Sequence, residues 1–95
     1  MNEVEFSRLQ NTIKRIVADD FENLAIIKDE LHKLTPEFRP QVPEIESALM
    51  RLVARGEVNS FELSAKAPPK QVPCTAARLG ELWFCLSDRA TLADT

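Results

Sequence analysis

Apolar residues recur three and four positions apart in the first part of the chain, a spacing that places them on one face of an α-helix. The pattern predicts a first helix from Glu5 to Val17 and a second from Asn23 to Lys33. Asn23 or Asp20 can cap the second helix. One fused helix over residues 5–33 is the alternative, because no glycine or proline separates the segments. The residues expected to be buried are Phe6, Leu9, Ile13, Ile16, Val17, Leu24, Ile27, Leu31 and Leu34.

A proline-rich segment follows the second helix, with three prolines between Thr35 and Pro43. Each proline lacks a backbone donor and restrains the residue before it to extended conformations, so this segment is predicted to be a connecting turn. Pro43 also suits the first turn of a third helix, and Gly56 suits the left-handed residue that ends one. The apolar face of the third helix is expected to carry Ile45, Ala48, Leu49, Leu52 and Val53.

Beyond Gly56, apolar and polar residues alternate as they do in half-buried β-strands. The first strand is predicted within residues 57–65, with a buried face of Phe61, Leu63 and Ala65. The second is predicted within residues 81–87, with Leu82, Phe84 and Leu86 on its core side and Trp83 and Cys85 on the other. Residues 66–80 are too many for a tight hairpin and are expected to form an extended loop stiffened by proline. One helical turn from Thr75 to Leu79 is an option within this loop.

The length of 95 residues and the apolar content of 44% fit one compact domain. We expect residues 1–95 to form that single domain, with a core of about residues 5–88 and a frayed tail of residues 89–95. The N-terminus has neither the positive start nor the apolar run of a secretory signal, and no stretch approaches the ~18 apolar residues of a membrane span. These features predict a soluble, cytoplasmic protein with no membrane partner.

The formal net charge is −3, which removes the simplest argument for nucleic-acid binding, because phosphate affinity comes mainly from clustered lysine and arginine. The charges are unevenly distributed along the chain. Residues 1–32 carry four basic and seven acidic side chains, residues 33–78 carry seven and five, and residues 79–95 carry one and three. The middle segment is therefore mildly basic.

The spacing of the cysteines and the histidine predicts neither a metal site nor a catalytic site. Cys74 and Cys85 show no CxxC spacing and His32 is distant from both in sequence, so no metal is predicted. His32 also has no serine, cysteine or paired carboxylate at catalytic spacing. We therefore predict no enzyme, no cofactor and no small-molecule ligand.

The order of three helices, strand, loop and strand resembles the winged helix-turn-helix superfamily over roughly residues 5–88. The segment from Leu49 to Val58 resembles the end of the recognition helix of that superfamily, and Leu82 to Asp88 resembles its last strand. The resemblance implies an α+β fold in which a two-stranded hairpin forms a wing beside a three-helix bundle, with the loop of residues 66–80 at its tip. It also implies a DNA-binding or transcription-associated module that contacts double-stranded DNA through the third helix and the wing. The residues expected to contact DNA are Arg39, Ser47, Arg51, Arg55, Lys66, Lys70 and Arg78.

The start of the third helix departs from a good DNA reader, because Glu44 and Glu46 stand where such a helix usually presents neutral or basic side chains. The two carboxylates can instead stabilise the positive end of the helix dipole. The basic residues can equally be ordinary solvated surface charge, and Trp83 can be covered by the loop or the first helix. A winged helix that associates with a protein partner or a second copy is the alternative function. The residues expected to serve it are Glu44, Glu46, Met50 and Trp83.

Overall fold

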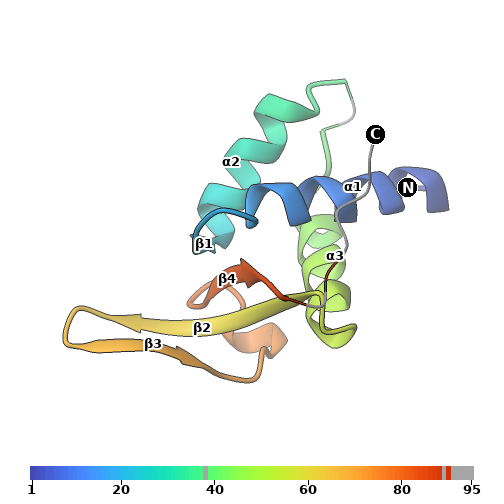
Figure 1. Cartoon of the computed structure of the whole chain (residues 1–95). Helices are drawn as coiled ribbons and strands as arrows, with labels where there is room; N and C mark the ends of the chain where they lie inside the picture. Colours follow the sequence, from blue (N-terminus) through green and yellow to red (C-terminus); the bar gives the residue numbers. More distant parts are fainter. Residues whose placement is uncertain (38, 89, 91–95) are drawn as a thin grey trace.

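The computed structural model describes residues 1–37, 39–88 and 90 and has an α+β fold. Within these residues, three α-helices accompany a four-stranded antiparallel sheet, an arrangement consistent with winged-helix-like topology (Figure 1). In chain order the elements are α1 (Glu3–Ile16), β1 (Glu22–Asn23), α2 (Leu24–Leu34), α3 (Val42–Ala54), β2 (Val58–Ser64), β3 (Ala67–Gln71), the 3₁₀ turn η1 (Ala76–Arg78) and β4 (Trp83–Leu86). Most of the predicted tail, residues 89 and 91–95, lies outside the described residues. No helix of the described chain is long and apolar enough to cross a membrane.

Helix α1 begins two residues before the predicted start because its first turn is capped. The Asn2 side chain accepts a hydrogen bond of 2.8 Å from the backbone N–H of Glu5, and the Asn2 N–H donates to Glu5 Oε1 at 3.3 Å. This reciprocal capping box satisfies two backbone donors that a helix start leaves without partners. The apolar periodicity locates the helix body, whereas the capping pair sets where it begins.

Helices α1 and α2 are separate, so the alternative of one fused helix is wrong. The chain turns over residues 17–20, and the Phe21 N–H donates to Asp20 Oδ1 at 2.7 Å. Of the two residues predicted to cap α2, Asn23 is the cap, because its side chain accepts from the Ile26 N–H at 2.9 Å. The predicted burial of Leu34 is also wrong, since this residue ends α2 with 55% of its surface exposed.

Helix α3 starts with proline in its first turn and is followed by a left-handed glycine, as the sequence predicts. Pro43 occupies the first turn, and Glu44 Oε1 accepts a hydrogen bond of 2.7 Å from the Gln41 N–H. Gly56 has φ of 75°, a conformation that L side chains rarely adopt. The turn at Gly56 leads directly into β2.

The sheet has the strand order β1-β4-β2-β3, so the predicted two-stranded hairpin is too small by two strands. Strand β3 occupies the segment predicted to be a loop and contains Pro68 and Pro69. It is an edge strand, and a residue without an N–H is tolerated there because one side of an edge strand makes no ladder hydrogen bonds. Strand β1 was not expected, and its two residues pair with β4. The optional helical turn is present as η1 within the predicted bounds.

The register of β2 with β4 decides which residues face the helices. Ser60 lies opposite Phe84, and both are buried, whereas Phe61 lies opposite Trp83 on the other side of the sheet. The predicted buried face of Phe61, Leu63 and Ala65 is therefore wrong, while the predicted assignment of β4 is correct for Phe84 and Trp83. Beyond residue 61 the β2–β3 hairpin extends past the helices, so its residues are exposed whichever way they point (Figure 1).

The helices and the inner side of the sheet enclose one apolar core. The fully buried core residues are Leu9, Ile13, Val17, Ile27, Leu31, Ile45, Ala48, Leu49, Leu52, Val58, Leu79, Leu82 and Phe84.

Candidate interaction surface

The outward side of α3, the predicted recognition surface, is mostly uncharged. Pro43, Ser47 and Ala54 are exposed on it, and Glu46 and Met50 are half-buried at its margin. The Met50 sulfur lies 3.5 Å from the Cys74 Sγ, which holds Met50 against the segment after β3. Glu44 caps its own helix through the Gln41 N–H, which favours the local role of this carboxylate over a contact with a partner.

Carboxylates engage several of the basic residues expected to contact DNA. Arg78 Nη2 lies 3.0 Å from Glu62 Oε2, and its Nε lies 3.5 Å from Glu81 Oε2. The hydrogen bond to Glu62 is the main cause that raises the pKa of Arg78; desolvation opposes it, and the charge of Glu62 and the bond and charge of Glu81 add to the rise. Lys70 lies directly opposite Glu62 in the β2–β3 register. The hairpin therefore offers little net positive charge to a phosphate backbone.

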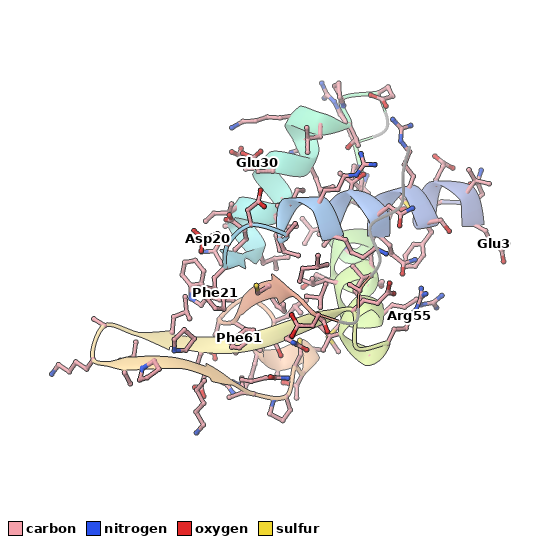
Figure 2. The ribbon with its side chains drawn as sticks, viewed as in Figure 1. Glu3, Asp20, Phe21, Glu30, Arg55 and Phe61 are labelled. Atoms are coloured by element: carbon pink, nitrogen blue, oxygen red, sulfur yellow. The ribbon has the colours of Figure 1, made fainter. Side chains whose placement is uncertain are left out.

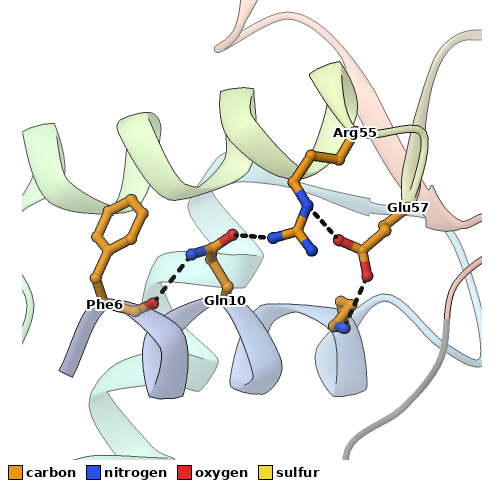
Figure 3. A network of polar contacts seen from close by, with 5 residues as sticks. Phe6, Gln10, Arg55 and Glu57 are labelled. Atoms are coloured by element: carbon orange, nitrogen blue, oxygen red, sulfur yellow. Dashed lines mark hydrogen bonds and ion pairs between the residues drawn. The ribbon is translucent and has the colours of Figure 1, made fainter. Parts of the chain in front are cut away.

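A chain of polar contacts engages Arg55 between α1 and the turn after α3 (Figure 3). Arg55 Nη1 donates to Gln10 Oε1 at 3.4 Å, and Gln10 Nε2 donates to the Phe6 carbonyl at 3.5 Å. On its other side, Arg55 Nε lies 3.1 Å from Glu57 Oε2, an ion pair that is not aligned as a hydrogen bond. Lys14 completes the chain by donating to Glu57 Oε1 at 3.0 Å.

Arg55 thus serves the packing of α1 against α3, a role that the sequence did not suggest. Gln10 and Lys14 are only 7% exposed although polar. Each directly follows a core residue of α1, Leu9 and Ile13, which is the signal that could have placed them at the border of the buried face. Arg51 also contacts α1, with its guanidinium carbon 5.2 Å from the centre of the Phe6 ring.

The remaining predicted cations lie on separate elements. Arg39 lines a hollow of about 460 Å³ beside the α2–α3 turn, together with Lys28, His32 and Gln41. Lys66 is exposed in the turn between β2 and β3. Among the described residues, the predicted cations therefore leave one basic hollow at the α2–α3 turn and a single exposed lysine at the hairpin tip.

The outer side of the sheet carries a cluster of apolar side chains, which we call the aromatic face and define as Phe21, Phe61, Leu63 and Trp83. The rings of Phe21 and Phe61 meet edge to face, with centroids 5.0 Å apart and planes at 81° (Figure 2). Phe61 and Trp83 are directly opposite in the β2–β4 register, and Leu63 is 37% exposed. None of the four belongs to the buried core or to the half-buried residues packed against it.

Sequence reasoning found one member of the aromatic face and missed the others. Trp83 was expected on the side of β4 away from the core, which the register confirms. The alternation within β2 predicts burial of Phe61 and Leu63, which is wrong because Phe61 shares its side of the sheet with Trp83 and Leu63 is exposed. The sequence does not predict Phe21 as part of this surface, because its contact with Phe61 joins segments 40 residues apart and leaves no local pattern.

Carboxylates gather beside the aromatic face at the β1 side of the sheet. We call Asp19, Asp20, Glu22 and Glu30 the acidic edge; Asp20 directly precedes Phe21 and Glu30 lies above it on α2 (Figure 2). Burial raises the pKa of Glu22 above its ordinary value, and the charges of Asp20 and Glu30 raise it further. Arg15 lines a hollow with Glu22 and Glu30, and Lys33 Nζ lies 3.5 Å from Glu30 Oε1. Two cations therefore accompany four carboxylates.

No model of a known protein family matches this chain, and no curated protein sequence and no solved structure matches it.

Proposed function

We propose that this chain is a protein-association module of winged-helix type that holds a segment of a partner protein on its aromatic face. The observation that carries the proposal is the cluster of Phe21, Phe61 and Trp83 on the side of the sheet away from the core. Aromatic residues packed side by side at a surface are typical anchors of protein interfaces, where they gain affinity from burial of large apolar area at small cost in side-chain entropy.

The sheet edge favours contact through side chains over pairing of backbones. Strand β3 forms one edge of the sheet, and prolines such as its Pro68 and Pro69 are a feature of edge strands that do not pair with a further strand. The other edge strand, β1, has only two residues. A partner segment that lies across the outer side of the sheet meets Phe61 and Trp83 without using either edge.

Binding of double-stranded DNA through α3 and the hairpin is the second candidate function. The hollow lined by Lys28, His32 and Arg39 favours it, because it lies beside the turn that connects the two helices of a helix-turn-helix. The support for DNA binding is weaker than the support for protein association, because Arg55 and Arg78 form ion pairs with carboxylates of the chain itself.

A displayed peptide library selected against the folded chain tests the first candidate, with Phe61→Ala as the counter-selection. The chain contains one tryptophan, so a peptide that covers Trp83 changes the intrinsic fluorescence directly. Selected peptides are expected to lose about tenfold or more in affinity with Phe61→Ala, as anchors in interfaces do. Val4→Ala, at an apolar side chain 79% exposed on α1, is the matched control and should leave affinity unchanged.

Two results would contradict protein association on this face. One is a set of selected peptides that bind Phe61→Ala as tightly as the unmodified chain while thermal unfolding shows that the variant is folded. The other is tight binding of a mixed-sequence duplex that weakens steeply with salt and is lost on Arg39→Ala, which would instead support the DNA candidate.

A further inference from the structure

We infer that the segment bound by the aromatic face carries lysine or arginine beside an apolar anchor residue. This inference rests on the proposed function and adds the chemistry of the partner. The two observations behind it are the position of the acidic edge next to Phe21 and the surplus of negative charge there.

The acidic edge and the aromatic face are parts of one continuous surface. Asp20 accepts a hydrogen bond from the Phe21 N–H at 2.7 Å, and the Phe21 ring meets Phe61 at 5.0 Å. Consecutive residues are ~3.8 Å apart, so an apolar side chain seated on Phe61 and Phe21 leaves its neighbours about one to three positions away within reach of Asp20. Both Asp19 and Asp20 are exposed and accessible to such a neighbour.

The charges around this surface favour a cation over an anion or a neutral segment. Glu22 and Glu30 share a hollow with Arg15, and Lys33 lies between Asp29 and Glu30, at 3.2 and 3.5 Å. Segment 19–30 carries five carboxylates, Asp19, Asp20, Glu22, Asp29 and Glu30, and one lysine, Lys28. Even with Arg15 and Lys33 added, negative charge is in excess. A cationic partner gains from it, and an anionic one is repelled.

A second copy of the chain fits the aromatic face less well than a basic segment does, because of the same excess of negative charge. Two aromatic faces brought together would also bring together two chains of net charge −3, each with an acidic edge beside the contact. Like charges opposed across an interface cost affinity, so the same carboxylates that attract a basic segment disfavour self-association through this surface.

Two libraries with the same apolar anchors test the inference, one with flanking positions restricted to lysine and glutamine and the other to glutamate and glutamine. The lysine library is expected to yield binders at least about tenfold tighter than the glutamate library. The double variant Asp19→Asn/Asp20→Asn should reduce that preference about threefold or more, and asparagine at position 20 retains an acceptor for the Phe21 N–H. Asp88→Asn, at an exposed carboxylate outside the acidic edge, is the matched control and should leave the preference intact.

The outcomes separate this inference from the function on which it rests. Peptides that need Phe61 but bind equally well with lysine or glutamate flanks would overturn the inference and leave protein association standing. Equal loss from Asp88→Asn and from the acidic-edge variant would also overturn it. Peptides indifferent to Phe61→Ala would overturn the proposed function itself. A chain whose mass in solution is twice 10.7 kDa, and which becomes monomeric with Phe61→Ala, would show a second copy as the occupant and overturn the inference.

Discussion

The ammonium group of Lys14 lies 3.0 Å from Oε1 of Glu57, and the two side chains are 8% and 16% exposed. This ion pair joins the last turn of α1 to the turn that follows α3. Glu57 also meets Arg55, so one carboxylate holds two cations from different elements. A largely buried charge is tolerated only with such partners, because its removal from water is costly.

Lys14→Met should destabilise the fold by about 1–3 kcal/mol, since it leaves Glu57 with Arg55 alone in a site that is mostly shielded from water. Urea unfolding followed by circular dichroism measures the change. The double variant Lys14→Met/Glu57→Gln should lose less stability than the two single changes added together, because both charges are then removed. Strict additivity would show that the pair is not coupled.

Gly56→Ala should cost about 1 kcal/mol of stability. Gly56 has φ of 75° and a Cβ added there would meet no atom within 4 Å, so the cost comes from the left-handed backbone and not from crowding. Gly80→Ala is the control, because its added Cβ also meets no atom within 4 Å but its backbone is not left-handed. If both variants unfold at the same temperature, the cost does not come from the backbone conformation.

Ser60→Ala should lower stability by about 1 kcal/mol. Ser60 is 2% exposed, and its hydroxyl donates a hydrogen bond of 2.6 Å to the Val72 carbonyl, which then remains without that partner. Because the bond joins β2 to the segment after β3, amide hydrogen exchange near residue 72 should also become faster. A variant with unchanged stability and exchange would rule out this contribution.

Stability should depend on pH through Glu22, whose pKa is raised by burial, Asp20 and Glu30. A carboxyl with a higher pKa in the folded state binds its proton more tightly there, so the stability it contributes is present at low pH and is lost as pH rises through the folded pKa. The relevant window starts at the ordinary value of 4.5 and extends above it. Glu22→Gln should therefore unfold at a higher temperature than the unmodified chain at pH 7, with the difference shrinking in acid. A difference that is constant with pH would assign the effect to another cause.

The helices could be predicted because their signals are local. Periodic apolar residues locate α1, α2 and α3, Asn23 caps α2, and Gly56 marks the turn after α3. Strand β1 could not be predicted, because its two residues are a strand only through their pairing with β4. Strand β3 was missed because two adjacent prolines argue against a strand unless that strand is known to be at an edge.

The error in β2 explains why the candidate site was largely missed. A strand offers two alternating faces, and Val58 and Ser60 alternate as regularly as Phe61 and Leu63. The more apolar set, which contains Phe61 and Leu63, is the one that the pattern predicts to face the core, as is usual for a half-buried strand. Pairing with β4 reverses the choice, because Phe84 shares its side of the sheet with Ser60. The aromatic face therefore depends on the pairing of β2 with β4, two strands that are far apart in the sequence.

The projecting β2–β3 hairpin contributes no residue beyond Phe61 to the packing of the domain core. Every residue from Glu62 to Gln71 is exposed, and the buried core includes none of them. Changes of length or composition at the tip leave the packing of the helices untouched, so the hairpin can accept inserted residues or an added epitope while the domain keeps its structure. The tip is thus a natural attachment point for a probe that reports on the neighbouring surface.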